Sequence, residues 1–390
     1  MTNLAWLLLC AFVFSLPWEK SIQVEGLGTI SRVLGMLAVT AGALAAIQRR
    51  SVRAPNLAFI AATLFTGWTA LTWCWSIAPP ATAARAATFA QLLVMAWLIW
   101  DLCRTRAQQD GLLRAYVAGA VVSSLYTLSR FLQGEQTYYR RYATAGFDPN
   151  DLGLTVALSI PFGLYLALRS RGPAQWLYRL AAACAIGAVL LTASRSALIV
   201  TFLAFGFAVW TWRQSGLAQK LSTAALLAVL LLGLVRLAPA PSRQRLATLP
   251  TEITQGTLHK RTTIWKSGLK ALKQHPVLGT GVGTYPEAVR PWLGTPQIPG
   301  HEYVAHNAFL SVLVESGLIG FSLFAALLGI LAVYIWIMPM PERALWATTL
   351  AMWAVGVSTL TWEHRKPGWL IFALIMAAWA RSFEPREKQS

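Results

Sequence analysis

Long apolar runs, separated by short polar or basic connections, recur along the whole chain. About 20 consecutive apolar residues form a helix long enough to cross the ~30 Å hydrocarbon core of a bilayer. The pattern predicts twelve such helices, at residues 3–18, 27–47, 56–75, 82–100, 111–132, 151–168, 174–192, 196–212, 219–237, 306–337, 343–362 and 367–381. We therefore expect an all-α polytopic membrane protein, with residues 1–390 forming a single integral membrane domain.

The composition excludes an ordinary soluble domain. Hydrophobic residues make up 56% of the chain and charged residues 12%, whereas soluble proteins carry about 25% charged residues. Residues 1–18 have no basic start and no small-residue cleavage site before Trp18, so we expect the first helix to be retained. The four cysteines occur singly, in or beside apolar runs, and predict neither a metal site nor a disulfide framework.

The distribution of basic residues predicts the orientation, because short cytoplasmic connections are enriched in Lys and Arg. With a cytoplasmic N-terminus, the inside connections contain Arg49, Arg50, Arg53, Arg104, Arg106, Arg169, Arg171, Arg213, Lys220, Arg343, Arg381, Arg386 and Lys388. The opposite short connections are poorer in charge, as in residues 76–81. An even number of helices then places the C-terminus in the cytoplasm as well.

Three outward-facing places are nevertheless basic. They are residues 130–141, with Arg130, Arg140 and Arg141, residues 363–366, and the long loop 238–305. The loop holds eight Lys or Arg against three Glu, a net charge of +5. These cations could form a solvated surface that meets anionic lipid headgroups, or a site that gathers phosphates, and the two interpretations are compatible.

Within the loop, residues 258–275 have helical spacing. Trp265, Leu269 and Leu272 fall on one stripe, beside a stripe of lysines. We expect an amphipathic helix that lies on the membrane with this apolar stripe down and ends before Pro276. The glycines of residues 279–283 predict a flexible turn whose backbone passes close to another segment.

Five motifs follow one another in a fixed order within this hydropathy pattern. They are Asp148-Pro149-Asn150-Asp151, Thr192-Ala193-Ser194-Arg195-Ser196-Ala197, Arg261-Thr262-Thr263-Ile264-Trp265, Pro276-Val277-Leu278-Gly279-Thr280-Gly281-Val282-Gly283, and His306-Asn307-x-x-Leu310-x-x-Leu313-x-Glu315-x-Gly317-x-x-Gly320. Together they resemble the bacterial O-antigen ligase family, which shares a superfamily with O-antigen polymerases and protein O-oligosaccharyltransferases. The resemblance spans roughly residues 147–320.

The resemblance implies a GT-C-like membrane glycosyltransferase with about twelve helices. It places the chain in the bacterial inner membrane, with loop 238–305 in the periplasm between the ninth and tenth helices. The implied reaction needs neither metal nor cofactor and involves no nucleic acid. A glycan is moved from undecaprenyl diphosphate to a sugar hydroxyl of lipid A-core oligosaccharide, which completes lipopolysaccharide at the periplasmic face. By motif, His306 takes the place of the family's essential histidine, and Arg195 and Arg261 take the places of arginines that hold the diphosphate.

These residue types suit the chemistry. A neutral imidazole can take a proton from the attacking hydroxyl, and guanidinium groups bind phosphate oxygens in pairs. A single displacement at the anomeric carbon predicts inversion. Both residues also have simpler interpretations: His306 as a helix-start histidine bonded to a loop carbonyl, and Arg195 as an interfacial arginine reaching to headgroups.

Further residues are predicted to support the site. The serines beside Arg195 could cap the next helix, Asn307 could orient His306 or cap the tenth helix, and Glu315 could pair with a buried arginine. Residues proposed to bind the acceptor are His301, Glu302, Tyr303, Arg140, Arg141 and Lys366.

Three other functions compete with ligation. An O-antigen polymerase uses the same donor and is not cleanly separated by sequence, and a protein O-oligosaccharyltransferase is a weaker alternative. A transporter of lipid-linked glycans should show charges at mid-membrane and two related halves, but the charges here gather at one face and no repeat is visible. A metal site is not expected, because His301 and His306 are five residues apart and no Asp-x-Asp occurs.

Overall fold

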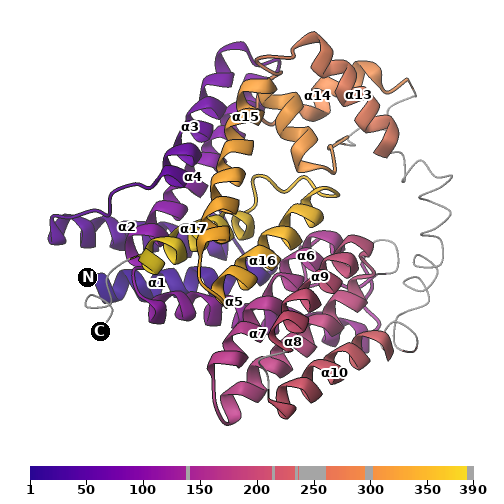
Figure 1. The fold of residues 1–390 in the computed structure, drawn as a ribbon. Coiled ribbons are helices and arrows are strands. Elements are labelled where there is room, and N and C mark those ends of the chain that lie inside the picture. Colours follow the sequence, from indigo (N-terminus) through magenta and orange to yellow (C-terminus); the bar gives the residue numbers. More distant parts are fainter. Residues whose placement is uncertain (138–140, 213–215, 233–235, 237–260, 295–301, 384–390) are drawn as a thin grey trace.

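The computed structural model describes residues 1–137, 141–212, 216–232, 236, 261–294 and 302–383, and these are mostly helical (Figure 1). The helices are α1 (Thr2–Ser15), α2 (Ile30–Arg49), α3 (Leu57–Leu71), α4 (Pro79–Leu102), α5 (Arg106–Leu132), α6 (Pro149–Ala157), α7 (Ser159–Arg169), α8 (Pro173–Thr192), α9 (Arg195–Trp212), α10 (Leu217–Leu232), α13 (Arg261–Gln274), α14 (Tyr285–Val289), α15 (Ala308–Ile337), α16 (Glu342–Val357) and α17 (Lys366–Phe383). Short 3-10 helices occupy Leu16–Ser21, Thr72–Trp75 and Arg290–Trp292, and strands β1 (Gln23–Val24) and β2 (Gly28–Thr29) form an antiparallel hairpin.

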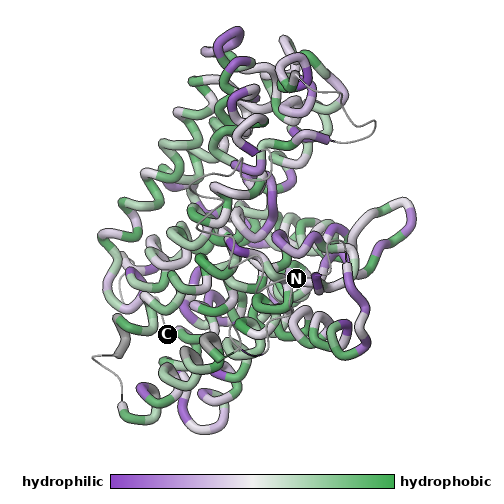
Figure 2. Tube along the Cα trace, turned by 90° about the vertical axis from the view of Figure 1, so that its right-hand side faces the viewer, coloured by the Kyte–Doolittle hydropathy of each residue, from purple (hydrophilic) through white to green (hydrophobic). Residues whose placement is uncertain are grey.

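Each of the twelve predicted segments coincides with a described helix, the sixth with the consecutive pair α6 and α7. Within the described residues, eight helical spans are long and apolar enough to cross a membrane, and α9 is apolar but shorter. The chain is therefore an all-α polytopic membrane protein, as predicted, while the count of twelve spans stays a prediction. Apolar residues dominate the bundle and hydrophilic ones concentrate towards its ends and connections (Figure 2).

The span formed by α6 and α7 lies at the centre of the helices around it. Its most apolar stretch is 83% buried, more than any other candidate span in the described part of the chain. It packs against α5, α8 and α9, and α16 closes over α7 and α9. Figure 1 shows α6–α10 grouped on one side and α3, α4 and α15 on the other, with α16 and α17 between them.

One end of the bundle, here called the paired end, is held by buried carboxylates. Asp101 pairs with Arg49 and Arg104, Asp110 with Arg169, and Glu342 with Arg106 and Arg381. The three acidic side chains are at most 8% exposed. Several arginines that the sequence assigns to the cytoplasmic side thus lie at the same end of the structure.

The opposite end, here called the loop face, carries α13, α14 and residues 302–307. It is fastened to the bundle where α15 breaks at Gly317, which has φ 65° and ψ −172°. The carbonyls of Val314 and Glu315 accept hydrogen bonds from Thr280 (3.2 Å) and Gly281 (2.8 Å). In return, the N–H groups of Leu318 (2.9 Å) and Ile319 (3.3 Å) donate to the carbonyls of Pro276 and Val277. Segment 276–283 therefore supplies the backbone partners that the broken helix lacks.

The glycines of this segment allow that approach. A Cβ on Gly279 would overlap the backbone of Glu315 and Gly317, and one on Gly283 would lie 3.0 Å from the carbonyl oxygen of Ala81. Gly281 faces Ser76 and Thr82 in the same way. The predicted close passage of this backbone is confirmed, and its neighbours are α15 and the start of α4.

Gly279→Ala should detach the loop from α15. The backbone there has φ 73°, which costs an alanine ~1–2 kcal/mol, and overlap with α15 adds to this. Gly26→Ala is the matched control, because Gly26 has φ 72° but no atom within 4 Å of a Cβ. We expect Gly279→Ala to lower the thermal unfolding temperature further than Gly26→Ala, and to expose residues 261–294 to proteolysis. Equal effects would mean that backbone strain alone matters at Gly279.

Candidate active site

Helix α13 rests on the loop face through small residues. Its buried side consists of Ile264, Ser267, Gly268 and Ala271, packed towards α14 and α15. The sequence predicted this helix, and of its predicted apolar stripe Leu272 packs against the buried cluster while Leu269 is 47% exposed, so that contact of the stripe with the membrane stays a prediction. Small residues form most of the buried side because Gly268 lies against the ring of Tyr285, where a larger side chain would not fit. Residues 258–260 of the predicted helix lie outside the described residues.

His306 stands immediately before α15 in an unusual backbone conformation, with φ 46°. Its N–H donates to Oγ1 of Thr361 at 2.9 Å. The carbonyl of Ala305, one residue earlier, accepts from Nε1 of Trp265 at 2.8 Å. Asn307 caps α15 by accepting from the N–H of Leu310 at 3.0 Å, which confirms the predicted cap. A left-handed backbone costs a non-glycine residue ~1–2 kcal/mol, so neighbours on α13 and after α16 hold His306 in place.

Arg195 is the first residue of α9, next to a sharp turn. Ala193 ends α8 with φ 50°, and Oγ of Ser194 accepts from the N–H of Ala197 at 3.4 Å. The predicted serine cap is thereby confirmed. A Cβ on Gly153 of α6 would lie 2.7 Å from Cβ of Ala197. Helix α6 and the turn before α9 are thus in direct contact.

Arg261 is the first residue of α13 and is far from Arg195 in sequence, yet the two interact. Burial lowers the pKa of the Arg261 guanidinium, the positive charge of Arg195 lowers it further, and Asp148 opposes both effects. Asp148 caps α6 by accepting from the N–H of Asn150 at 2.8 Å. Two guanidinium groups and one carboxylate, at the starts of α9, α13 and α6, thus interact electrostatically.

The residues predicted to bind the acceptor fall into different places. Arg141 is 3% exposed and donates to the carbonyl of Thr192 (2.6 Å) and to Asn150 (2.8 Å), so it braces the turn before α9. Lys366 bonds with Glu19 and Ser31 at the start of α17. Tyr303 packs against the buried apolar residues shared by α13, α14 and α15. Arg140 and His301 lie outside the described residues. Glu302 lines a polar cleft described below. An acceptor role for any of these six stays a prediction.

A polar cleft of about 430 Å³ lies beside His306. The residues that line it come from α4, α14, α15 and residues 302–305 and 361–364, and include Ala81, Arg85, Thr88, Tyr285, Glu302, Ala305, Ser311, Glu315, Thr361 and His364. His306 does not itself line the cleft. Its backbone lies directly behind the wall, because Ala305 precedes it and Thr361 accepts its N–H.

Arg85 organises one side of this cleft. Its Nη1 lies 3.3 Å from Oε1 of Glu363 and 2.7 Å from Nδ1 of His364. Burial would raise the pKa of Glu363, but its contact with His364 and the charge of Arg85 hold that pKa below its ordinary value. Burial lowers the pKa of His364. Nδ1 of His364 also lies 3.1 Å from Oε1 of Glu363, so this one ring nitrogen stands between a guanidinium donor and a carboxylate acceptor.

Glu315 has a different role from the one predicted. It was expected to pair with a buried arginine, but its carboxylate accepts from the backbone N–H groups of Gly283 (2.9 Å) and Tyr285 (3.0 Å). Arg85 acts on it only as a neighbouring charge. Glu315 therefore ties the glycine segment to α15, at the floor of the cleft.

Sequence reasoning missed Arg85 as a site residue. Its partner Glu363 is 278 positions away, and no local motif surrounds it. The available signal was a lone arginine two turns into an apolar helix, where a charge requires a partner or a cavity. Residues 363–366 were recognised as a basic stretch, but the pairing within them was not.

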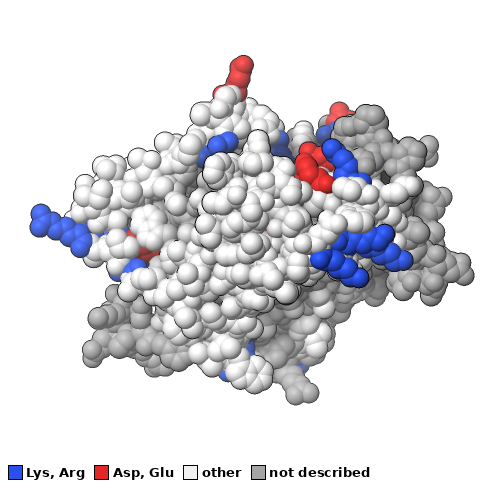
Figure 3. All heavy atoms as spheres, turned by 90° about the horizontal axis from the view of Figure 1, so that it is seen from above, with Lys and Arg blue, Asp and Glu red and all other residues white. Residues whose placement is uncertain are grey.

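Positive charge also marks the exposed side of α13, where Lys266, Lys270 and Lys273 are exposed. Figure 3, which looks onto the loop face, shows Lys and Arg in a few separate groups, with some Asp and Glu, on a mostly uncharged surface. Lys270 lies over the ring of Trp292, at 5.8 Å from its centroid. These exposed lysines fit the predicted solvated basic surface. Arg195 and Arg261 are not part of it.

Two known proteins or families are similar to this chain. Residues 180–325 match the family model described as O-antigen ligase, and the match includes Arg195, Arg261 and His306. The chain is also 25% identical over 298 residues to the exopolysaccharide production protein ExoQ of Rhizobium meliloti (strain 1021), covering 73% of this chain and 67% of that protein. The resemblance predicted from the motifs is thus confirmed: over residues 180–325, this integral membrane protein is similar to the O-antigen ligase family.

Proposed function

We propose that the protein transfers a glycan from undecaprenyl diphosphate to a sugar hydroxyl of lipid A-core oligosaccharide, at the periplasmic face of the bacterial inner membrane. The observation that carries this proposal is the electrostatic interaction between the guanidinium groups of Arg195 and Arg261. Two like charges close together in a partly buried place disfavour each other's charged form. An anionic ligand between them would remove this repulsion. Both residues start helices, where backbone N–H groups add further attraction for anions.

A diphosphate fits this arrangement better than a single charge does. Two guanidinium groups can each bind phosphate oxygens in pairs and remain charged throughout the reaction. Asp148 offsets part of their charge and helps to keep them together before the donor arrives. The negative charge that grows on the leaving diphosphate would then be stabilised by groups already in position.

His306 is the proposed general base. The acceptor hydroxyl gives its proton to a ring nitrogen of His306, its oxygen bonds to the anomeric carbon, and the bond from that carbon to the diphosphate oxygen breaks. The electron pair of that bond leaves with the diphosphate. One displacement of this kind inverts the anomeric configuration. The polar cleft beside Ala305 and Thr361 offers a place for the acceptor sugar.

The charge distribution supports the proposed orientation. Arginines at the paired end lie on the ends of α2, α5, α7 and α17, as the positive-inside rule requires of a cytoplasmic side. The loop face is then periplasmic, and both termini are cytoplasmic. Independence from metal is part of the proposal, since the two tasks of proton removal and charge stabilisation have side chains to perform them.

A polymerase is the second candidate. ExoQ is described as an exopolysaccharide production protein, and a polymerase would use the same lipid-linked donor with a second lipid-linked glycan as acceptor. The arginines and His306 would keep their roles, so the acceptor alone separates the two functions.

Reconstitution of the purified protein with undecaprenyl-diphosphate-linked glycan and lipid A core tests both candidates. Without metal or nucleotide, we expect glycan to appear on lipid A core on a gel. His306→Ala should reduce the rate by ~10²–10⁴-fold while insertion and thermal unfolding stay unchanged. His275→Ala, at the exposed end of α13, is the control and should remain active. Longer glycans on the lipid carrier would identify a polymerase, and no transfer with competent substrates would reject both.

Arg195→Lys should lose ~10–100-fold in rate, because a lysine keeps the charge but cannot replace a bidentate contact. The loss should be seen in kcat/KM for the donor and be smaller for the acceptor. Arg171→Lys, exposed at the paired end, should be neutral. Near-normal rates for Arg195→Lys would make Arg195 an interfacial residue.

Thr361→Val tests the positioning of His306. It removes the acceptor of the His306 N–H, a contact worth ~1 kcal/mol, and frees a strained backbone to relax. We expect about a tenfold fall in kcat with little change in KM, and rescue by Thr361→Ser. Thr359→Val, whose hydroxyl bonds only within its own turn to Gly356, is the matched control. An unchanged kcat would show that Thr361 does not position His306.

A further inference from the structure

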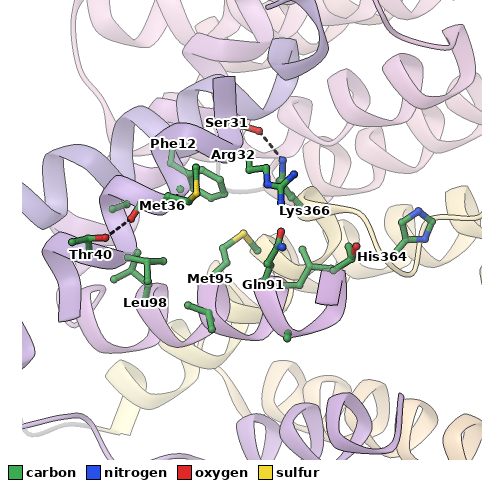
Figure 4. A pocket seen from close by; sticks show the side chains of 17 residues that line it. Phe12, Ser31, Arg32, Met36, Thr40, Gln91, Met95, Leu98, His364 and Lys366 are labelled. Carbon is green, nitrogen blue, oxygen red and sulfur yellow. Dashed lines mark hydrogen bonds between the residues drawn. The ribbon is translucent and has the colours of Figure 1, made fainter. Parts of the chain in front are cut away.

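A second cavity opens between α2 and α4, away from the arginine pair. It has a volume of about 580 Å³ and runs along the outer side of the bundle (Figure 4). Arg32, Ser31 and Lys366 lie at one end, and Thr40 and Leu98 lie towards the other (Figure 4). From Arg32 to Thr40, α2 rises about 12 Å. The groove is thus an elongated slot that begins near the loop face and extends towards the middle of the bundle.

Polarity changes along this slot. Its deeper part is lined by Phe12, Val39, Met95 and Leu98, which offer only apolar contact. Its mouth has two cations. Lys366 is held by Glu19 and Ser31. Arg32 is exposed and makes no hydrogen bond or ion pair with any residue that the structure describes. An apolar slot below a free guanidinium matches a lipid chain below an anionic headgroup.

The surroundings of the slot point to a membrane lipid as the occupant. Met36 is 45% exposed and Val94 39% exposed on its rims, and the neighbouring Leu37 is 50% exposed. These apolar side chains belong to candidate membrane spans, so their exposed surface faces hydrocarbon. A chain can therefore enter the slot sideways from the bilayer.

The slot adjoins the polar cleft. Thr88 and His364 line both cavities. A lipid whose headgroup sits at Arg32 and Lys366 has its attached sugars directed past these two residues, towards Ala305 and Thr361. The arginine pair of the donor lies elsewhere, at the starts of α9 and α13.

We propose that the α2–α4 groove binds the lipid anchor of the acceptor, with a phosphate of the acceptor at Arg32 and Lys366 and one of its chains between Met36 and Met95. This assignment rests on the proposed function, because that function requires a second, lipid-anchored substrate. The groove then determines which glycolipid presents a hydroxyl to His306.

The test uses photoreactive phosphatidic acid, with a diazirine in one acyl chain, and the full-length protein in phosphatidylcholine vesicles. After illumination, labelled peptides are mapped by mass spectrometry. We expect labels on α2 and α4 around Met36 and Met95. Met36→Trp should fill the slot and reduce this labelling at least fivefold. Leu37→Trp is the matched control, since Leu37 is equally exposed but does not line the slot.

The headgroup is tested separately. Arg32→Gln should weaken labelling by phosphatidic acid about tenfold and leave labelling by an analogous zwitterionic phosphatidylcholine probe unchanged. Arg50→Gln, at the other end of α2, should change neither. Equal labelling of Met36→Trp and Leu37→Trp, or no dependence on Arg32, would overturn the groove as an anionic lipid site.

Competition identifies the substrate. Lipid A core should displace the probe, and undecaprenyl-diphosphate-linked glycan should not. In a transfer assay, Met36→Trp should raise KM for the acceptor and not for the donor. Displacement by the donor alone, or by neither lipid, would overturn the acceptor assignment. Labelling needs no turnover, and His306→Ala should be labelled like the native chain. A failed transfer assay with localised labelling would therefore count against the proposed function and not against the groove.

Discussion

The break in α15 and the backbone that docks onto it are the constraint on which the site depends. Inside a membrane protein, an interrupted helix must find partners for the freed carbonyl and N–H groups. Segment 276–283 supplies them, and Glu315 adds two bonds to the same backbone. Because α13 precedes this segment and α14 follows it, the docking fixes the position of Arg261. Helix α15 itself begins just after His306 and its cap Asn307. His306 and Arg261 are therefore both positioned by α15.

The site itself is assembled from the starts of helices rather than from a single motif. Arg195 and Arg261 each open a helix, and Asp148 caps a third. The turn before Arg195 is braced by Arg141 and by direct contact with Gly153. Each guanidinium is held near a like charge at some electrostatic cost, which rigid packing makes tolerable. In the proposed function, a bound diphosphate would remove this cost, which would favour the donor over neutral lipids.

Hydropathy alone predicted every helix of the bundle, because long apolar runs permit only helices in a membrane. Local signals also predicted the caps at Ser194 and Asn307, whose partners lie three residues away. Local sequence patterns did not predict the partners of side chains that contact residues distant in the sequence. Glu315 accepts from the backbone N–H groups of Gly283 and Tyr285 instead of pairing with an arginine. The Arg85–Glu363 pair joins residues too distant for any spacing rule.

The proposed function has two lipid-anchored substrates, and both would arrive in the plane of the bilayer. Two separate entries would keep them from blocking each other. Arg195 and Arg261 lie on the side of α9 and α13, whereas the apolar slot opens between α2 and α4. The polar cleft lies between the slot and the loop that carries His306. Arg85, Glu302 and Thr361 line it with both donors and acceptors. Such a lining suits sugar hydroxyls, which need both, and would reject a bare lipid chain.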